Sequence, residues 1–227
     1  MSSIATTRKL LTARADVVGS LLRPQYLLQA REQLERGELT PAAFKAIEDR
    51  AVDEAIALQE AAGLDVVTDG EMRRYAFYGH LVEALEGFEK YAGWSITFRD
   101  GQGHEASLKR PVVVDKLKWR RQMAVEEFTY LRGRTKAMPK VTLISAQQAA
   151  AYYDPDRSKS AYPTRDAYLA DLVDFTRREI AELGRLGCEY VQIDAPQSDR
   201  SRRTHRTCSC DCRGRCEFRR SCPGARR

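Results

Sequence analysis

The chain has 227 residues, enough for one α/β domain with a sizeable core but short of the roughly 250 residues of a complete (β/α)8 barrel. Its net charge of +6 comes from the tail, because residues 199–227 carry ten Arg, no Lys and three acids, which leaves residues 1–198 at −1. No run approaches the roughly 18 apolar residues of a membrane span. A body with Cys188 as its one thiol and no signal peptide predicts a cytoplasmic protein without a membrane partner.

The first third of the chain predicts a strand followed by two helices. Residues 15–19 form a short apolar run that breaks at a glycine, and Pro24 suits the first turn of a helix ending near residue 36. Thr40 is the expected N-cap of the next helix. Apolar residues then recur every three or four positions up to Gly63, which predicts one buried helical face.

Two later strands share one pattern, in which a helix closed by glycine leads into a short apolar strand that ends in a carboxylate. Leu64–Asp69 is followed by Glu71, and Tyr190–Asp194 is followed by Pro196. The pattern is typical of buried parallel strands with a functional acid at the carboxyl end. The alternative is an ordinary core strand whose Asp caps the next helix, but the repetition favours the functional interpretation.

The middle of the chain predicts an insertion. A helix is expected over about residues 79–88. The alternation over residues 94–98, followed by Asp100-Gly101, predicts a β-hairpin that returns near Pro111.

Apolar strands that alternate with helices predict a parallel α/β fold. The segment after Gly19 lacks the later glycines of a phosphate-binding fingerprint, so a nucleotide-binding doubly wound sheet is disfavoured. The predicted fold class is a partial (β/α)8 TIM barrel of about five neighbouring parallel strands, with the inserted hairpin and a disordered C-terminal tail. The strands are expected at residues 15–19, 65–69, 112–115, 140–144 and 189–194.

In such a barrel the carboxyl ends of the strands meet at one mouth. Several acids and few bases there would suit an amine, another cation or a metal. The residues expected at the mouth are Ser20, Asp69, Glu71, Asp115, Ser145 and Asp194.

Four motifs, in order, resemble the cobalamin-independent methionine synthase family, above all its short single-barrel bacterial members. The resemblance covers nearly all of residues 10–197. Its motifs are Val17-Val18-Gly19-Ser20 with Arg23-Pro24, Thr68-Asp69-Gly70-Glu71, Val141-Thr142-Leu143 and Val191-Gln192-Ile193-Asp194-Ala195-Pro196.

The resemblance implies zinc-dependent transfer of a methyl group from a methylated folate to a thiol such as homocysteine, as in methionine biosynthesis. Some short relatives act on other thiols, such as coenzyme M. By the same resemblance, Ser20, Glu71 and Asp194 bind the amino-acid end of the thiol substrate. Two carboxylates and a hydroxyl are suitable acceptors for an ammonium group.

The resemblance ends near Gln197. The family's zinc ligands, a His-x-Cys pair, a Glu and a further Cys, come from later strands, and so does its catalytic His; none has a counterpart in this chain. Zinc is therefore the cofactor expected from the family, but this chain lacks the ligands to bind it. We expect the chain to be an inactive fragment. Five strands of an eight-stranded barrel would also leave unpaired edges, so we expect poor solubility.

The sequence divides into a barrel portion, residues 1–198, and an Arg- and Cys-rich tail, residues 199–227. The tail could bind a metal through Cys208, Cys210 and Cys212 together with Cys216 and Cys222, or nucleic acid through its arginines. Its abrupt start and its lack of Lys favour a third interpretation, translation in a shifted frame, with disorder as the consequence. Two other functions stay open: a barrel of the uroporphyrinogen decarboxylase type, and a basic binding protein that acts through its tail.

Overall fold

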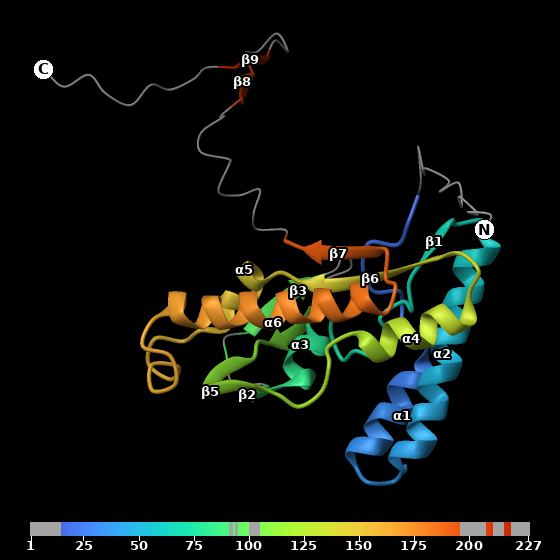
Figure 1. Ribbon diagram of the computed structural model, residues 1–227, viewed down its shortest axis with the longest axis horizontal. Coiled ribbons are helices and arrows are strands. Elements are labelled where there is room, and N and C mark those ends of the chain that lie inside the picture. The colour runs from blue at the N-terminus through green and yellow to red at the C-terminus, as the bar shows by residue number, and fades with distance from the viewer. Residues whose placement is uncertain are drawn as a thin grey trace, which may run out of the picture. The chain divides into compact units, whose positions relative to one another are not determined.

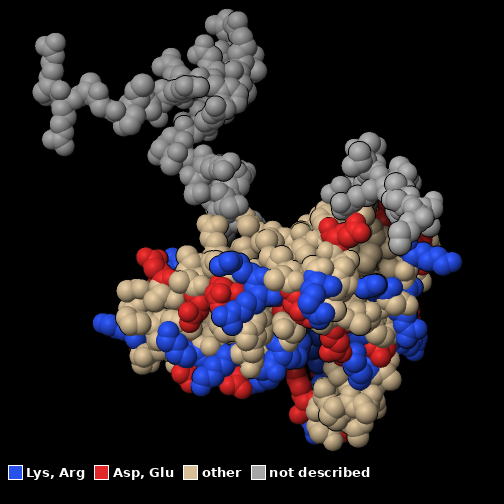
Figure 2. Space-filling model, viewed as in Figure 1, with Lys and Arg blue, Asp and Glu red and all other residues tan. Residues whose placement is uncertain are grey.

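The computed structural model describes residues 15–90, 93, 95–99, 105–195, 208–210 and 216–218. The chain divides into two compact units, residues 1–194 and residues 195–227. The first unit contains a three-stranded sheet in the order β1-β6-β7, with helices packed against it (Figure 1). Basic and acidic side chains are interspersed on the face seen in Figure 2, in line with the near-neutral composition of this part of the chain.

The sheet is parallel. Strand β1 (Val66–Val67) and strand β7 (Tyr190–Asp194) both pair in parallel with β6 (Met138–Ile144), with Val67 opposite Pro139 and Ile144 opposite Asp194. Three of the five predicted strands are therefore confirmed as neighbours in one parallel sheet. Strand β7 is an outer strand of the described sheet, and Ile193 on it is 48% exposed.

Two helices precede β1. Helix α1 (Gln25–Glu35) begins directly after Pro24, and α2 (Pro41–Ala61) is capped by Thr40, whose hydroxyl accepts a hydrogen bond from the Ala43 N–H at 3.3 Å. Both helices confirm the predicted starts. Their facing apolar residues form one core cluster, which includes Leu27, Ala30, Phe44, Val52 and Ile56 and extends to Val67 of β1.

Helices α4 (Val125–Arg134) and α6 (Arg165–Arg185) lie alongside strands β6 and β7 (Figure 1). Ala124 and Phe128 at the start of α4 pack with Val141, Leu143 and Leu183 in a second cluster. Helix α6 is capped by Thr164, whose hydroxyl accepts from the Ala167 N–H at 3.1 Å. Between β6 and α6 run the short helices α5 (Ala146–Ala149) and η1 (Ala150–Tyr152).

The first predicted strand is wrong: residues 15–18 form no strand in the described part of the chain. The segment is held by side chains instead of a backbone ladder. The buried Lys140 ammonium donates to the Val17 carbonyl and pairs with Asp16 at 3.2 Å, and the Gln192 amide donates to the Val18 carbonyl at 2.7 Å. These bonds place the segment against β6 and β7 without making it a strand.

The third predicted strand is also wrong. Strand β5 (Val112–Trp119) pairs antiparallel with β2 (Leu85–Glu89), in a separate two-stranded sheet. The helix predicted over residues 79–88 is shorter in the structure. It is α3 (Gly79–Ala84), which ends where the backbone becomes extended at Leu85. Gly87 has φ +99°, and a Cβ there would lie 2.7 Å from the Asp115 carbonyl, so the pairing of β2 with β5 needs glycine at this position.

The inserted hairpin is confirmed. Strand β3 (Ser95–Arg99) pairs antiparallel with β4 (Glu105–Lys109), while its expected Asp100-Gly101 turn lies outside the described residues. None of the helices in the described ranges combines the length and apolar character that crossing a membrane would need.

In the second unit, β8 (Cys208–Cys210) pairs antiparallel with β9 (Cys216–Phe218), which places Cys210 opposite Cys216. The predicted absence of regular structure in the tail is therefore not met at these six residues. The remainder of residues 196–227 lies outside the described part of the chain.

Candidate functional site

The candidate site is built on the segment that follows β1. The side-chain amide of Gln59 on α2 holds the start of this segment, donating to the Thr68 carbonyl at 2.8 Å and accepting from the Thr68 N–H at 2.9 Å. Gly70 and Glu71 then both adopt positive φ, +68° and +56°. Such a conformation is rare for a residue other than glycine, and the Asp69 carboxylate supports it by accepting from the Glu71 N–H at 2.9 Å.

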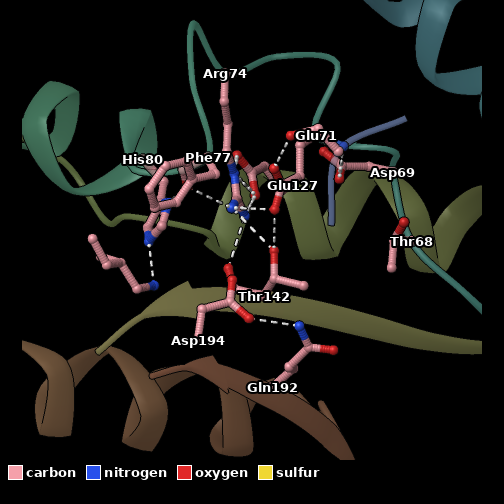
Figure 3. Close-up of polar contacts among 12 residues, drawn as sticks. Thr68, Asp69, Glu71, Arg74, Phe77, His80, Glu127, Thr142, Gln192 and Asp194 are labelled. Carbon is pink, nitrogen blue, oxygen red and sulfur yellow. Dashed lines mark hydrogen bonds and ion pairs between the residues drawn. The ribbon is translucent and has the colours of Figure 1, made fainter. Parts of the chain in front are cut away.

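This turn directs the Glu71 side chain into a polar cluster (Figure 3). One carboxylate oxygen of Glu71 accepts from the Thr142 hydroxyl at 2.7 Å and from Arg74 at 3.1 Å, and the other accepts from the Ser20 hydroxyl. Glu71 is 1% exposed, whereas Ser20 is exposed. The structure therefore brings two of the three predicted site residues into direct contact, with one of them open to solvent.

Arg74 fixes the other side of the cluster. Its buried guanidinium donates to the Glu127 carboxylate at 2.6 and 2.9 Å and to the Thr142 carbonyl at 2.8 Å, in addition to its bond with Glu71. Two carboxylates around one guanidinium raise the pKa of Arg74 although burial acts in the opposite direction. The cation is therefore retained, and Glu71 is held in one orientation.

Asp69 is buried beside this cluster. One of its oxygens binds the Glu71 N–H, and the other has no hydrogen-bond partner among the described residues. Burial, together with the nearby Glu127 charge, raises the pKa of Asp69 to about 6.

Asp194, the third predicted site residue, stands at the end of β7, on the strand next to Thr142. Its carboxylate accepts from the Gln192 amide at 2.6 Å (Figure 3). Asp194 is half-buried, and within the described residues it makes no hydrogen bond to Ser20 or Glu71. Burial raises the pKa of Asp194, and the Glu71 charge adds to this effect, so the two carboxylates interact electrostatically.

Two of the other residues expected at the mouth serve local structure. Asp115 is exposed on β5, where its carboxylate accepts from the Lys116 N–H at 2.7 Å, so this expectation is wrong because β5 belongs to the other sheet. Ser145 follows β6 but caps α5, accepting from the Gln148 N–H at 3.1 Å.

Three residues of the cluster were not predicted from the sequence. Thr142 could have been found, because Lys140 and Thr142 are alternate polar residues in an otherwise apolar strand and so share one face. Arg74 was not singled out, because it lies in a segment rich in basic and aromatic residues. Glu127 carries no local signal, since it belongs to the first turn of an ordinary helix.

The zinc that the family resemblance implies does not fit the described residues. They contain no group of three or more His, Cys, Asp and Glu side chains that could hold a metal ion. His80 is committed to the backbone, because its Nε2 accepts from the Ile144 N–H at 3.2 Å and its Nδ1 lies 3.1 Å from the Phe77 carbonyl. Cys188 precedes β7, at the opposite end of that strand from Asp194.

Comparisons with known proteins agree on one family. The model of the cobalamin-independent synthase catalytic domain matches residues 13–210, so the match extends past Gln197 into the tail. The uncharacterized protein YxjH of Bacillus subtilis is 31% identical over 183 residues, which are 80% of this chain and 47% of that protein. The methionine synthase of Pyrococcus abyssi is 28% identical over 183 residues, 80% of this chain and 51% of the relative. The chain thus spans about half the length of these curated relatives.

Two solved structures share the fold. A B12-independent methionine synthase from Shewanella sp. W3-18-1, in complex with selenomethionine, aligns with a TM-score of 0.56 at 24% identity over 70% of this chain and 44% of that one. A putative vitamin-B12-independent methionine synthase from Listeria monocytogenes aligns with a TM-score of 0.59 at 24% identity, over 80% and 51%. The family match decides against a barrel of the uroporphyrinogen decarboxylase type, and the chain belongs to the cobalamin-independent methionine synthase family.

Proposed function

We propose that this chain carries the amine-binding part of a catalytic domain that transfers a methyl group from a methylated folate to a thiol amino acid such as homocysteine. The observation that carries the proposal is the contact between Ser20 and Glu71, which lies beside Asp194 at the carboxyl end of the parallel sheet. Membership of the methionine synthase family supports the reaction class.

The chemistry of the cluster suits an ammonium group. Arg74 and Thr142 hold Glu71 from one side, so its second oxygen faces the exposed Ser20 hydroxyl. Burial is the main cause of the raised pKa of Asp194, and the negative charge of Glu71 raises it further, as expected for two carboxylates that repel one another. A cation bound between them would relieve this repulsion, while the Ser20 oxygen would accept a further hydrogen bond.

These side chains bind and orient the substrate and do not react with it. The described residues offer no zinc ligand set, so the activation of the thiol is not assigned to any of them. We therefore propose that the chain alone binds the amino acid without turning it over.

Binding of homocysteine, measured by isothermal titration calorimetry, tests the site. Asp194→Asn keeps the shape of the side chain but removes its charge, and should weaken binding by about tenfold or more, since a hydrogen bond to a charged group contributes about 1.5–3 kcal/mol. Asp115→Asn is the matched control, because Asp115 is an exposed carboxylate outside the cluster. Equal affinities for the two variants would contradict the proposal.

A second ligand makes the test specific for the amine. The desamino analogue 4-mercaptobutanoate keeps the thiol and the carboxylate of homocysteine. The wild-type chain should bind it more weakly than homocysteine, and Asp194→Asn should reduce that discrimination. A wild-type chain that does not distinguish the two ligands would show that the cluster is not an amine site.

A further inference from the structure

A cavity of about 310 Å³ lies among α1, α2, α3, α4 and the segment after β1. It adjoins the candidate site through Glu127, which lines the cavity and also binds Arg74. Its lining is strongly charged and consists of Arg31, Phe44, Lys45, Glu48, Arg73, Glu83, Arg121, Glu126 and Glu127.

Two arginines that line the cavity carry buried hydrogen-bond donors without a partner among the described residues. The Arg31 Nε and both the Nε and Nη1 of Arg73 are buried and have no partner among the described residues. The Arg73 side chain is only 8% exposed. Unsatisfied buried donors of this kind are costly and call for an explanation, such as a bound acceptor.

Most other charges of the cavity are already paired. Lys45 binds Glu126 at 2.9 Å, and Arg121 lies 3.5 Å from Glu83. Arg73 also binds Asp49 through its Nη2, which leaves its other nitrogens unused.

Glu48 lies between the two arginines without binding either of them closely. Its oxygens are 3.5 Å from Arg31 and 3.8 Å from Arg73, whereas direct charge-assisted bonds are about 2.7–2.9 Å long. Glu48 therefore satisfies the two guanidinium groups poorly, and a cavity adjoins all three side chains.

We propose that this cavity is an oxyanion-binding site, in which a sulfate, phosphate or carboxylate group bridges Arg31 and Arg73 while Glu48 is neutral. An oxyanion supplies several acceptors at the distances that two guanidinium groups require. The site goes beyond the proposed amine-binding function, because its ligand has the opposite charge.

The protonation of Glu48 would control this site. Burial raises the pKa of Glu48 to about 7, against the opposing effect of Arg31, Arg73 and Lys45, while Glu83 raises it further. Arg121, Glu126 and Glu127 complete the charged lining. Below neutral pH the loss of the Glu48 charge leaves Arg31 and Arg73 with excess positive charge, which favours an anion.

Sulfate is the appropriate probe, because its own charge does not change between pH 6 and pH 8. Calorimetric titration of the full chain, at fixed ionic strength in chloride, should show about tenfold tighter sulfate binding at pH 6 than at pH 8, as follows from a group that titrates near 7. Glu48→Gln should bind sulfate equally at both pH values, with the affinity of the wild-type chain at pH 6. Phosphate and acetate titrations then show which oxyanion is preferred.

Arg31→Met should abolish sulfate binding, whereas Arg178→Met, on an exposed part of α6, should leave it unchanged. Equal binding by these two variants would overturn the proposal, since the sulfate would then not use the cavity. If Arg31→Met does not fold, Glu48→Gln still decides: a pH dependence equal to that of the wild-type chain would overturn the proposal as well.

Discussion

Arg74 and Glu127 form a buried ion pair that joins the segment after β1 to the first turn of α4, across 53 residues of sequence. Their side chains are 2% and 9% exposed, and the guanidinium binds both carboxylate oxygens. The same guanidinium orients Glu71, so the ion pair is part of the support of the candidate site.

Replacing Arg74 should therefore destabilise the whole first unit. In Arg74→Met the carboxylates of Glu71 and Glu127 remain buried without their cation, which should lower the free energy of unfolding by about 3–5 kcal/mol. Urea denaturation monitored by circular dichroism measures this change. Arg178→Met, which removes an exposed arginine, is the control and should be nearly neutral. A decrease in the free energy of unfolding as small as that of the control would show that Arg74 does not stabilise the first unit.

The enclosed Asp69 should make stability depend on pH. Its pKa is about 6 in the folded chain against a reference of 3.8, so the folded state binds more protons than the unfolded state between these values. The free energy of unfolding should therefore fall as pH rises from about 4 to 6, by about 2–3 kcal/mol from this group, and should not change further above that range.

Asp69→Asn removes this titration and keeps an oxygen for the Glu71 N–H. The wild-type value minus the variant value of the unfolding free energy, measured at several pH values, isolates the contribution of Asp69. A difference that increases with pH would mean that the carboxylate is stabilised as an anion, contrary to this prediction.

Gly70 should tolerate alanine poorly for two separable reasons. Its φ of +68° disfavours any side chain, and a Cβ would lie 3.1 Å from Ala55 and 3.2 Å from Met72. Gly37 has a similar φ of +73° with no atom within 4 Å of a Cβ, so Gly37→Ala is the matched control for the backbone effect. Gly70→Ala should cost about 1–3 kcal/mol more than Gly37→Ala in thermal or urea unfolding, because it also overpacks the site. Equal costs would mean that the neighbours move aside.

An assay of methyl transfer tests whether the tail supplies metal ligands. Without a zinc ligand set in the described residues, we expect no methyl transfer to homocysteine by this chain, with or without added zinc. The assay should be run beside the variant in which Cys208 and Cys210 are changed to Ser. Zinc-dependent turnover that the double variant loses would show that the tail provides metal ligands, and would overturn the interpretation of the tail as a shifted reading frame.

The sequence predicted the parts of the fold that depend on local pattern. Helix α2 has its Thr40 cap and a strict apolar period, and the strand ending at Asp194 has an apolar run between a glycine and a proline. The sequence could not predict the direction of strand pairing, because the apolar run Val112–Val114 is typical of a buried strand in a parallel or an antiparallel sheet. Gly87, which lies within the expected helix, was the one local indication of the antiparallel partner. Ser20, Glu71 and Asp194 were predicted as site residues through the family resemblance, whereas Arg74 and Glu127 meet only through the tertiary fold.

The attachment of residues 16–18 has a consequence for the order of events during synthesis. Lys140 and Gln192, which bind the carbonyls of Val17 and Val18, lie 123 and 174 residues further along the chain. Residues 16–18 emerge from the ribosome before either partner, so these two hydrogen bonds form only after β6 and β7 have been synthesised.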